Sequence, residues 1–305
     1  MFSMKILLTG ASSYVGSHLT RTLSSQGHLV VGTFRRANSR TDALSALPKV
    51  ELVQINLAVD SDFRKVATDF DAVVHNAGSF PWVDVDISNV VSCNVLGTLN
   101  LANWARRLET VSRIVAYSTL SVYGNVSDHI LSESTPTNSS EIYGSSKLAA
   151  EHIMNQVSEC KNQLIIRFPI VLGNSAHRAF IPRMVENFVE NEPVIISNPN
   201  KLYNSMTTLK AVAEFTNHYL NSESKNLHTV NIGAEKPISI IEIAEFLRLQ
   251  TGSRSKIIIN EEESNCYLID SSLAIKLGYK APTVQEALSY YASESNWAGK
   301  LASRG

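Results

Sequence analysis

Short apolar runs alternate with helical stretches along the first 170 residues of the chain. The runs are apolar at successive positions, which is typical of strands buried on both faces of a parallel sheet. They cover residues 5–10, 28–34, 50–57, 71–78, 113–119 and 163–173, and helical periodicity separates them at 16–28, 94–108 and 141–157. A strand, helix, strand order repeated this often predicts an α/β fold with a doubly wound parallel sheet.

The pattern loosens after residue 174, where several prolines and short elements follow one another. Helical periodicity returns near 181–191, 208–220, 239–250 and 283–292. We therefore expect two domains. The first covers 1–173, and the second is a smaller, mixed α/β domain over 174–305, with segments from about 205–235 packing on the first.

The composition excludes several classes of protein. The chain of 305 residues carries a net charge of −1, with 44% apolar and 18% charged residues, so it lacks the basic surface that nucleic-acid binding requires. No apolar run reaches the ~20 residues of a membrane helix, and the run at 6–8 is too short for a signal peptide. Cys93, Cys160 and Cys266 match neither zinc spacing nor a disulfide framework. We therefore expect no metal site and a reducing, cytoplasmic location.

The motif TGASSYVG, residues 9–16, follows the first expected strand and opens a helix. Amide groups at a helix N-terminus bind pyrophosphate, so this turn is a candidate dinucleotide site, and a turn without a ligand is the alternative. Gly10 permits the tight turn, and Gly16 permits close packing of the helix on the strand. Ser13 stands where the usual fingerprint has its middle glycine. It must avoid positive φ or accept strain of about 1 kcal/mol.

The second expected strand ends in GTFRR, residues 32–36. NAD-binding folds place a carboxylate here that accepts from the ribose 2′-hydroxyl and would repel a 2′-phosphate. This chain has Phe34, Arg35 and Arg36 instead, and a guanidinium can bind a phosphate bidentately. The pattern favours NADP, with NAD possible. Two solvated arginines are the alternative, and the sequence leaves open which arginine contacts the cofactor.

Tyr143 and Lys147 in YGSSK stand at i and i+4, so they share one face of an expected helix. A free phenol has a pKa of ~10. A nearby ammonium and an oxidised nicotinamide would favour the phenolate and lower that pKa. The tyrosine could then exchange a proton with a carbinol while hydride moves to or from the cofactor. Thr119 ends the fifth expected strand and could hold the substrate oxygen; an aromatic packed beside an exposed lysine is the alternative.

In this order the motifs resemble those of the extended short-chain dehydrogenase/reductases, the NAD(P)-dependent sugar epimerase/dehydratase family. The resemblance covers nearly the whole chain and includes DAVVHNAG (71–78), Asn94 with Gly97 and Thr98, VYG (122–124), YGSSK with Glu151, IIRFPIVLG (165–173), TVNIGAEKPISIIEIAEFL (229–247) and DSSLAIKLGY (270–279). It implies a Rossmann fold, a catalytic triad of Thr119, Tyr143 and Lys147, and a homodimer formed through helices 94–108 and 141–157.

The resemblance also implies which residues contact the ligands. Those expected at the cofactor are Gly10, Ser12, Ser13, Tyr14, Val15, Gly16, Phe34, Arg35, Arg36, Asn56, Leu57, Asn76, Ala77, Gly78, Asn94, Tyr143, Lys147, Phe168 and Pro169. Those expected at the substrate are Thr119, Ser121, Tyr143, Ile170, Arg178 and Asn204. Asn56, Ile170 and Asn204 depart from the usual aspartate, asparagine and arginine of the family, so the identity of the nucleotide sugar stays open.

The two residues after Thr119 limit which of the family's reactions this chain can catalyse. The sugar 4,6-dehydratases of this family use Asp-Glu there, and Leu120 and Ser121 cannot perform that elimination. The arginines at the adenosine end favour net reduction with NADPH, so a nucleotide-sugar 4-ketoreductase is the leading expectation. The alternatives are a nucleotide-sugar 4-epimerase, a reductase of a non-nucleotide ketone or aldehyde, and a non-enzymatic cofactor sensor.

Overall fold

The computed structural model describes residues 3–80, 86–126, 128–157, 162–176, 179–223, 227–260, 266–295 and 297. Contacts between residues divide the chain into two units. The first comprises Met1–Gly124, Glu133–Arg167 and Ala213–Val230, and the second comprises Asn125–Ser132, Phe168–Val212 and Asn231–Gly305. The main break therefore falls after Arg167, a few residues before the boundary proposed from the sequence, and one later segment returns to the first unit.

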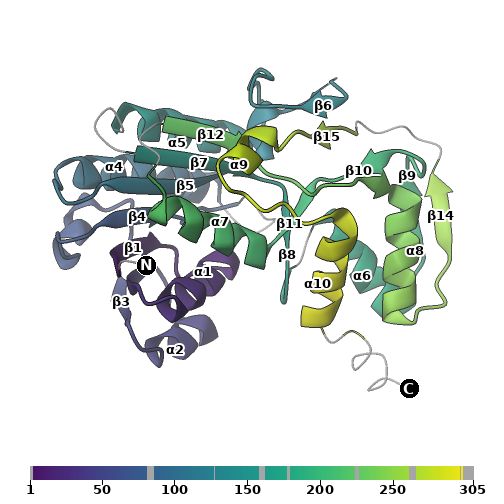
Figure 1. Ribbon diagram of the computed structural model, residues 1–305, viewed down its shortest axis with the longest axis horizontal. Coiled ribbons are helices and arrows are strands. Elements are labelled where there is room, and N and C mark those ends of the chain that lie inside the picture. The colour runs from purple at the N-terminus through teal and green to yellow at the C-terminus, as the bar shows by residue number, and fades with distance from the viewer. Residues whose placement is uncertain are drawn as a thin grey trace. The chain divides into compact units, whose positions relative to one another are not determined.

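The first unit is built on a seven-stranded sheet in the order β12-β7-β5-β4-β1-β2-β3 (Figure 1). Its strands are β1 Lys5–Thr9, β2 Leu29–Phe34, β3 Val50–Gln54, β4 Ala72–His75, β5 Arg113–Thr119, β7 Asn162–Phe168 and β12 Leu227–Asn231. Pairing is parallel from β3 through β2, β1 and β4 to β5. Every position of β4 is buried, as its continuous apolar run predicts. The predicted α/β, doubly wound fold is confirmed.

The strand order also places the site. The chain moves from β1 outward to β2 and β3, and then returns to β4 on the other side of β1. In doubly wound sheets, ligands bind beyond the carboxyl ends of the strands at this switch point. Thr9 ends β1 and His75 ends β4, so both lie at that point.

Helices cover both faces of this sheet, with α4 and α5 on one side and α1 and α2 on the other (Figure 1). The helices are α1 Tyr14–Ser25, α2 Ser39–Ser45, α3 Ile87–Val91, α4 Gly97–Arg106 and α5 Ile142–Val157; 3-10 turns form at Asp60–Lys65 and Leu120–Tyr123, and a π-helical turn at Ser92–Leu96. Leu101 and Trp104 of α4 and Met154 of α5 join Ile114 of β5 in one core cluster. Each fully buried large apolar side chain contributes about 1.5–3 kcal/mol.

The predicted strand over 163–173 is two strands rather than one. β7 ends at Phe168, and β8, Ile170–Leu172, pairs with β11, Met206–Thr208, in the second unit. Pro169 stands between β7 and β8 and has no N–H to donate to a ladder, which explains the break.

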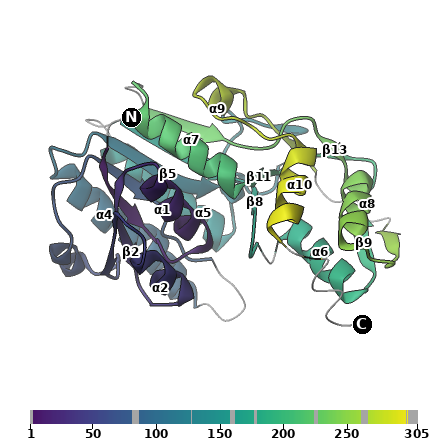
Figure 2. The ribbon, with the colours of Figure 1, turned by 60° about the horizontal axis from the view of Figure 1, so that its bottom comes forward.

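The second unit is a mixed α/β assembly. Its remaining strands pair as β6 Ile130–Leu131 with β15 Leu268–Ile269, β9 Val194–Ser197 with β14 Ile257–Asn260, and β10 Leu202–Tyr203 with β13 Ile238–Ser239. The helices are α6 Phe180–Glu190, α7 Leu209–Asn221, which leads back to the first unit, α8 Ile240–Thr251, α9 Ser272–Lys276 and α10 Val284–Glu294. Phe188, Leu247 and Leu288, from α6, α8 and α10, share one core, and Figure 2 shows these three helices gathered together. No helix within the described ranges is long and apolar enough to cross a membrane.

Candidate active site

The turn after β1 is shaped by its two glycines and by a serine cap. Gly10 has φ +71°, and a Cβ there would lie 2.8 Å from Ala77 Cα. A Cβ at Gly16 would collide with the Gly10 carbonyl. Ser13 has φ −76° and ψ 172°, and its Oγ accepts from the Gly16 amide at 3.0 Å as the N-cap of α1. Ser13 therefore avoids positive φ and the strain that would come with it. Its hydroxyl caps the helix, which a glycine at this position could not do.

Asn76 joins this turn to the segment after β4. Its Nδ2 donates to the Gly10 carbonyl at 3.1 Å and to Ser13 Oγ at 2.9 Å. Thr9 Oγ1 accepts from the Asn76 amide at 3.2 Å and from the Ala77 amide at 3.1 Å. The ends of β1 and β4 therefore form one hydrogen-bonded platform. The first turn of α1 carries no acidic side chain, which suits the pyrophosphate of a dinucleotide.

His75 is a buried member of this platform that the sequence reasoning did not assign. Its Nδ1 lies 2.8 Å from Thr9 Oγ1, and its Nε2 lies 2.9 Å from Thr98 Oγ1. Thr98 Oγ1 donates to the Asn94 carbonyl at 2.6 Å, so it accepts from Nε2–H, and Nδ1 is then the acceptor. Burial, with a smaller contribution from the charge of Lys147, lowers the pKa of His75 to about 3. The imidazole is therefore neutral and serves as a hydrogen-bonding link. The position of His75 at the end of a buried strand was the feature of the sequence that could have indicated a place at this site.

Asn94 lies in the π-helical turn between α3 and α4 and is 1% exposed. Its Oδ1 accepts from the Ser79 amide at 2.7 Å, and its Nδ2 donates to the Ser79 carbonyl at 2.9 Å and to Ser146 Oγ at 3.0 Å. These bonds hold residue 79 against α5. A Cβ at Gly78 would lie 4.0 Å from Lys147 Nζ, so the lysine reaches this segment. Asn94 thus shapes the expected cofactor segment through the backbone, and π-turns recur at functional sites.

The expected triad meets at the carboxyl end of β5. Thr119 ends that strand, and its side chain hydrogen-bonds with Tyr143 from α5. Thr119 Oγ1 also accepts from the Ser121 amide and donates to Ser121 Oγ, both at 3.2 Å. The ring of Tyr143 packs on Phe80 with centroids 4.4 Å apart. Lys147 follows one turn later on α5 and is 6% exposed.

Burial dominates the proton affinities of this pair. It lowers the pKa of Lys147 to about 8, although the neighbouring Cys93 and Glu151 oppose the shift. Burial also raises the pKa of Tyr143 to about 12, although the side-chain hydrogen bond with Thr119 opposes the shift. The sequence reasoning expected the lysine to depress the tyrosine pKa. In the protein alone, desolvation of the phenolate is the largest influence, and the pKa is raised rather than lowered.

A buried ion pair supports the face of α5 that carries the expected catalytic residues. Arg167 of β7 donates from Nε to Glu151 Oε1 at 3.0 Å and from Nη2 to Oε2 at 2.7 Å. Its Nη1 donates to the Tyr123 hydroxyl at 2.7 Å. Glu151 stands four residues after Lys147, on the same face of α5. The pair ties the helix to the ends of β5 and β7, and the sequence reasoning noted Glu151 without giving it a role.

The residues expected at the adenosine end lie beyond β2 and β3. Phe34 is half-buried, and Arg35 and Arg36 are exposed. The charge of Arg35 reaches Cys93 in the π-turn, where it counters the rise in the cysteine pKa that burial causes. Of the other candidates, Asn56 Oδ1 accepts from the Ala58 amide, and the carbonyl of buried Leu57 accepts from Asn100.

The other expected substrate and cofactor residues belong mainly to the second unit. Phe168, Pro169 and Ile170 are half-buried, and Arg178 lies outside the described residues. Asn204 is 5% exposed; its Nδ2 donates to the carbonyls of Ala234 and Ile269, and its Oδ1 accepts from the Ile269 amide. The side chain of Asn204 is committed to the backbone of its own unit rather than to a substrate, which the sequence did not reveal.

The sequence matches the model of the NAD dependent epimerase/dehydratase family over residues 6–233. A Methanocaldococcus jannaschii protein, provisionally named UDP-glucose 4-epimerase, is 25% identical over 288 residues, which cover 90% of this chain and 92% of that protein. D-erythronate dehydrogenase of Haemophilus influenzae is 21% identical over 304 residues, covering 91% of this chain and 95% of the relative. The structure of UDP-glucuronic acid 4-epimerase from Bacillus cereus in complex with NAD shares the fold, with a TM-score of 0.82 at 23% identity over 98% of this chain and 97% of that one. Because the family match spans most of its length, the chain belongs to the NAD dependent epimerase/dehydratase family and is an enzyme of the short-chain dehydrogenase/reductase type.

Proposed function

We propose that this enzyme is a 4-epimerase of a nucleotide-linked sugar. The observation that carries the proposal is the group of Thr119, Tyr143 and Lys147 at the end of β5, followed by Leu120 and Ser121. This group can exchange a proton with a carbinol, whereas buried Leu120 and the hydroxyl of Ser121 cannot carry out water elimination. The likeness to a UDP-glucose 4-epimerase along most of the chain supports the epimerase over the ketoreductase that the sequence analysis favoured.

The proposed roles follow from the side chains. Tyr143 takes the proton of the sugar 4-hydroxyl as a phenolate and returns it as a phenol. Thr119 holds the same oxygen through its hydroxyl, and the Lys147 ammonium favours the phenolate. The platform of Gly10, Ser13 and Asn76 would hold the pyrophosphate of NAD at the start of α1. NAD supplies the hydride chemistry when bound. Since the proton of the 4-hydroxyl and the hydride from C4 both return to the sugar, epimerisation consumes no external reductant.

A second candidate is net reduction of a ketone with NADPH. Exposed Arg35 and Arg36 follow Phe34 at the end of β2, and none of the three can repel a 2′-phosphate. The relative named D-erythronate dehydrogenase supports a substrate without a nucleotide in this candidate.

Turnover without a reductant separates the two functions. The enzyme with NAD⁺ is incubated with UDP-glucose, UDP-galactose and UDP-glucuronic acid, and the products are resolved by chromatography. An epimerase interconverts a pair of 4-epimers with no net change in reduced cofactor. A reductase shows no epimer product, but oxidises NADPH in proportion to a keto-sugar or a small ketone. Stabilisation of the fold by UDP alone would support a nucleotide site.

The cofactor preference is a separate prediction. A charged hydrogen bond contributes about 1.5–3 kcal/mol, which is roughly 10- to 150-fold in affinity. If Arg35 or Arg36 binds a 2′-phosphate, NADPH binds more tightly than NADH, and Arg35→Ala or Arg36→Ala removes the difference. Calorimetric titration of both cofactors measures it. Equal affinities in the wild type would rule out the arginine site and, with it, the main support for the reductase.

We also propose that the enzyme works as a homodimer in the cytoplasm. Ile87, Val91 and Leu99 on α3 and α4 are 58%, 41% and 41% exposed, and Ile142 on α5 is 38% exposed. Leu99 and Ile142 lie on the two helices that the family resemblance assigns to the dimer, and Ile87 and Val91 lie on α3, which precedes them. Cys93 and Cys266 are free thiols, as suits a reducing compartment.

A further inference from the structure

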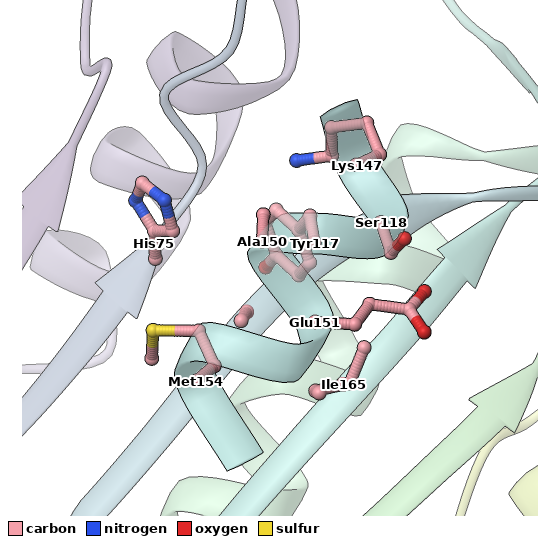
Figure 3. Close-up of a pocket in the computed structure, with 9 residues that line it drawn as sticks. His75, Tyr117, Ser118, Lys147, Ala150, Glu151, Met154 and Ile165 are labelled. Carbon is pink, nitrogen blue, oxygen red and sulfur yellow. The ribbon is translucent and has the colours of Figure 1, made fainter. Parts of the chain in front are cut away.

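A small cavity of about 10 Å³ lies inside the first unit, between α5 and the strands β4, β5 and β7 (Figure 3). It is lined by His75, Ala116, Tyr117, Ser118, Lys147, Ala150, Glu151, Met154 and Ile165. Such a volume is about that of one water-sized sphere. The cavity is therefore too small for any part of a sugar or a dinucleotide, and His75 is the one lining residue that it shares with the platform at the ends of β1 and β4.

Ser118 supplies an unsatisfied hydroxyl to this cavity. The residue is 5% exposed, and its Oγ has no hydrogen-bond partner among the described residues. Leaving such a group unpaired costs about 1–3 kcal/mol, so buried hydroxyls almost always have a partner. The neighbouring polar groups are already engaged. His75 bonds to two threonines, and the Tyr117 hydroxyl lies 2.6 Å from Thr216 Oγ1.

Glu151 supplies the complementary acceptor. Each of its oxygens accepts one hydrogen bond from Arg167 and keeps a further lone-pair site. Figure 3 draws the Ser118 hydroxyl and the Glu151 carboxylate on the same side of the cavity. Because Arg167 already balances the carboxylate, the cavity favours a neutral guest over a cation, and Glu151 disfavours an anion. A neutral guest of this size that both donates and accepts is water.

We propose that this cavity is a water site, in which one buried water accepts a hydrogen bond from Ser118 Oγ and donates one to the Glu151 carboxylate beside the stem of Lys147. Ser118 is then a positioning residue that acts through the lysine, and this part of the inference rests on the role proposed for Lys147. The water lies beside the stem of Lys147, on the side of α5 that faces the sheet, and adds a polar group to the surroundings of the buried lysine.

The charge of Lys147 is the quantity that the water should affect. The titratable groups around the lysine are His75 on β4, Cys93 in the π-turn, Tyr143 and Glu151 on α5, and Arg167 on β7 behind Glu151. His75 is neutral, and Glu151 favours the ammonium. Replacing the water with methyl groups removes a polar neighbour and should make the ammonium easier to deprotonate.

Crystal structures of the wild type and of Ser118→Val test the site directly. We expect one ordered water within hydrogen-bonding distance of Ser118 Oγ and a Glu151 oxygen in the wild type, and none in the variant. Ala116→Val fills the cavity from a position two residues earlier on β5 and should also expel the water, while leaving Ser118 in place. A well-ordered wild-type map without this water would overturn the proposal, whatever reaction the enzyme catalyses.

The pH profile tests the consequence for Lys147. In Ser118→Val and Ala116→Val, the apparent pKa of the alkaline limb of the kcat/KM profile should fall by about half a pH unit. At pH values above that pKa, kcat/KM should then be roughly threefold lower than in the wild type. Ala105→Val adds the same methyl groups to the buried face of α4 without lining the cavity, and it should leave the limb in place. If none of the sugars is turned over, the NAD⁺ affinity of each variant is measured as a function of pH in place of kcat/KM. Failure of the proposed substrate and failure of the proposed water site can then be told apart. An unmoved limb in both cavity variants would reject the positioning role.

Discussion

At the scale of single residues, the proposed chemistry depends on a phenol whose surroundings hold it neutral. Tyr143 bonds to Thr119 and packs on Phe80, and burial raises its pKa to about 12. Tyr143→Phe keeps the ring packing and removes the proton donor. We expect turnover to fall by about 10²- to 10⁴-fold with NAD⁺ affinity nearly unchanged. Kinetics and calorimetry of the same preparation measure both, and a phenylalanine variant with full turnover would refute the role.

Lys147 carries a cost in stability that the role proposed for it explains. Burial lowers its pKa to about 8 from an ordinary 10.5. At pH 7 the lysine is charged in both the folded and unfolded states, so the full cost of about 3 kcal/mol is present. As the pH rises through 8, the folded state loses its proton first and the cost shrinks, reaching zero above 10.5.

Lys147→Met should therefore inactivate the enzyme and stabilise the cofactor-free protein. The methionine keeps an unbranched stem without the charge, so we expect a higher Tm than that of the wild type at pH 7. The gain should shrink as the pH approaches 10, which thermal unfolding at several pH values measures. A Tm below that of the wild type at pH 7 would contradict the burial cost derived from the lowered pKa.

At the scale of elements, the start of α1 depends on a cap that replaces a glycine. Ser13 Oγ accepts from the Gly16 amide and from Asn76 Nδ2. Loss of an N-cap hydroxyl to alanine costs about 1 kcal/mol, and loss to glycine costs only a few tenths. Ser13→Ala should therefore lower the free energy of unfolding more than Ser13→Gly in urea denaturation. The reverse order would show that the hydroxyl does not cap the helix.

At the scale of the whole molecule, the helical layer of α3, α4 and α5 is the proposed dimer surface. Ala150 and Met154 of α5 are apolar too, but they are 5% and 1% exposed and pack inward, so they do not contribute to this surface. Ile142 of α5 and Leu99 of α4, at 38% and 41% exposure, are available to a partner. A stable interface buries at least about 1,000 Å² in total and excludes unpaired charge from its centre.

Leu99→Arg should therefore convert the dimer to a monomer. Leu249→Arg on α8 is a matched control, because Leu249 is 74% exposed in the second unit, outside the proposed surface. Light scattering at micromolar concentration measures both masses. A wild-type monomer would contradict the dimer, and a dimeric Leu99→Arg variant would move the interface elsewhere.

The local pattern determined much of this protein by itself. Continuous apolar runs specified a sheet buried on both faces, and the run from Ala72 to His75 is buried throughout. The i, i+4 spacing put Tyr143 and Lys147 on one face of a helix, and the order of motifs placed Thr119 at the sheet edge. These inferences succeed because strand period, helix period and parallel topology are set by neighbouring residues.

Only the tertiary structure decided what these side chains bond to and how they ionise. His75 connects Thr9 to Thr98, and Asn204 is committed to the backbone at Ile269, through contacts distant in sequence. Burial raised the Tyr143 pKa where the sequence suggested a lowered one, because desolvation depends on everything packed around the phenol. Hydrogen-bond partners and solvent exclusion come from segments far apart in the chain, and no local pattern records them.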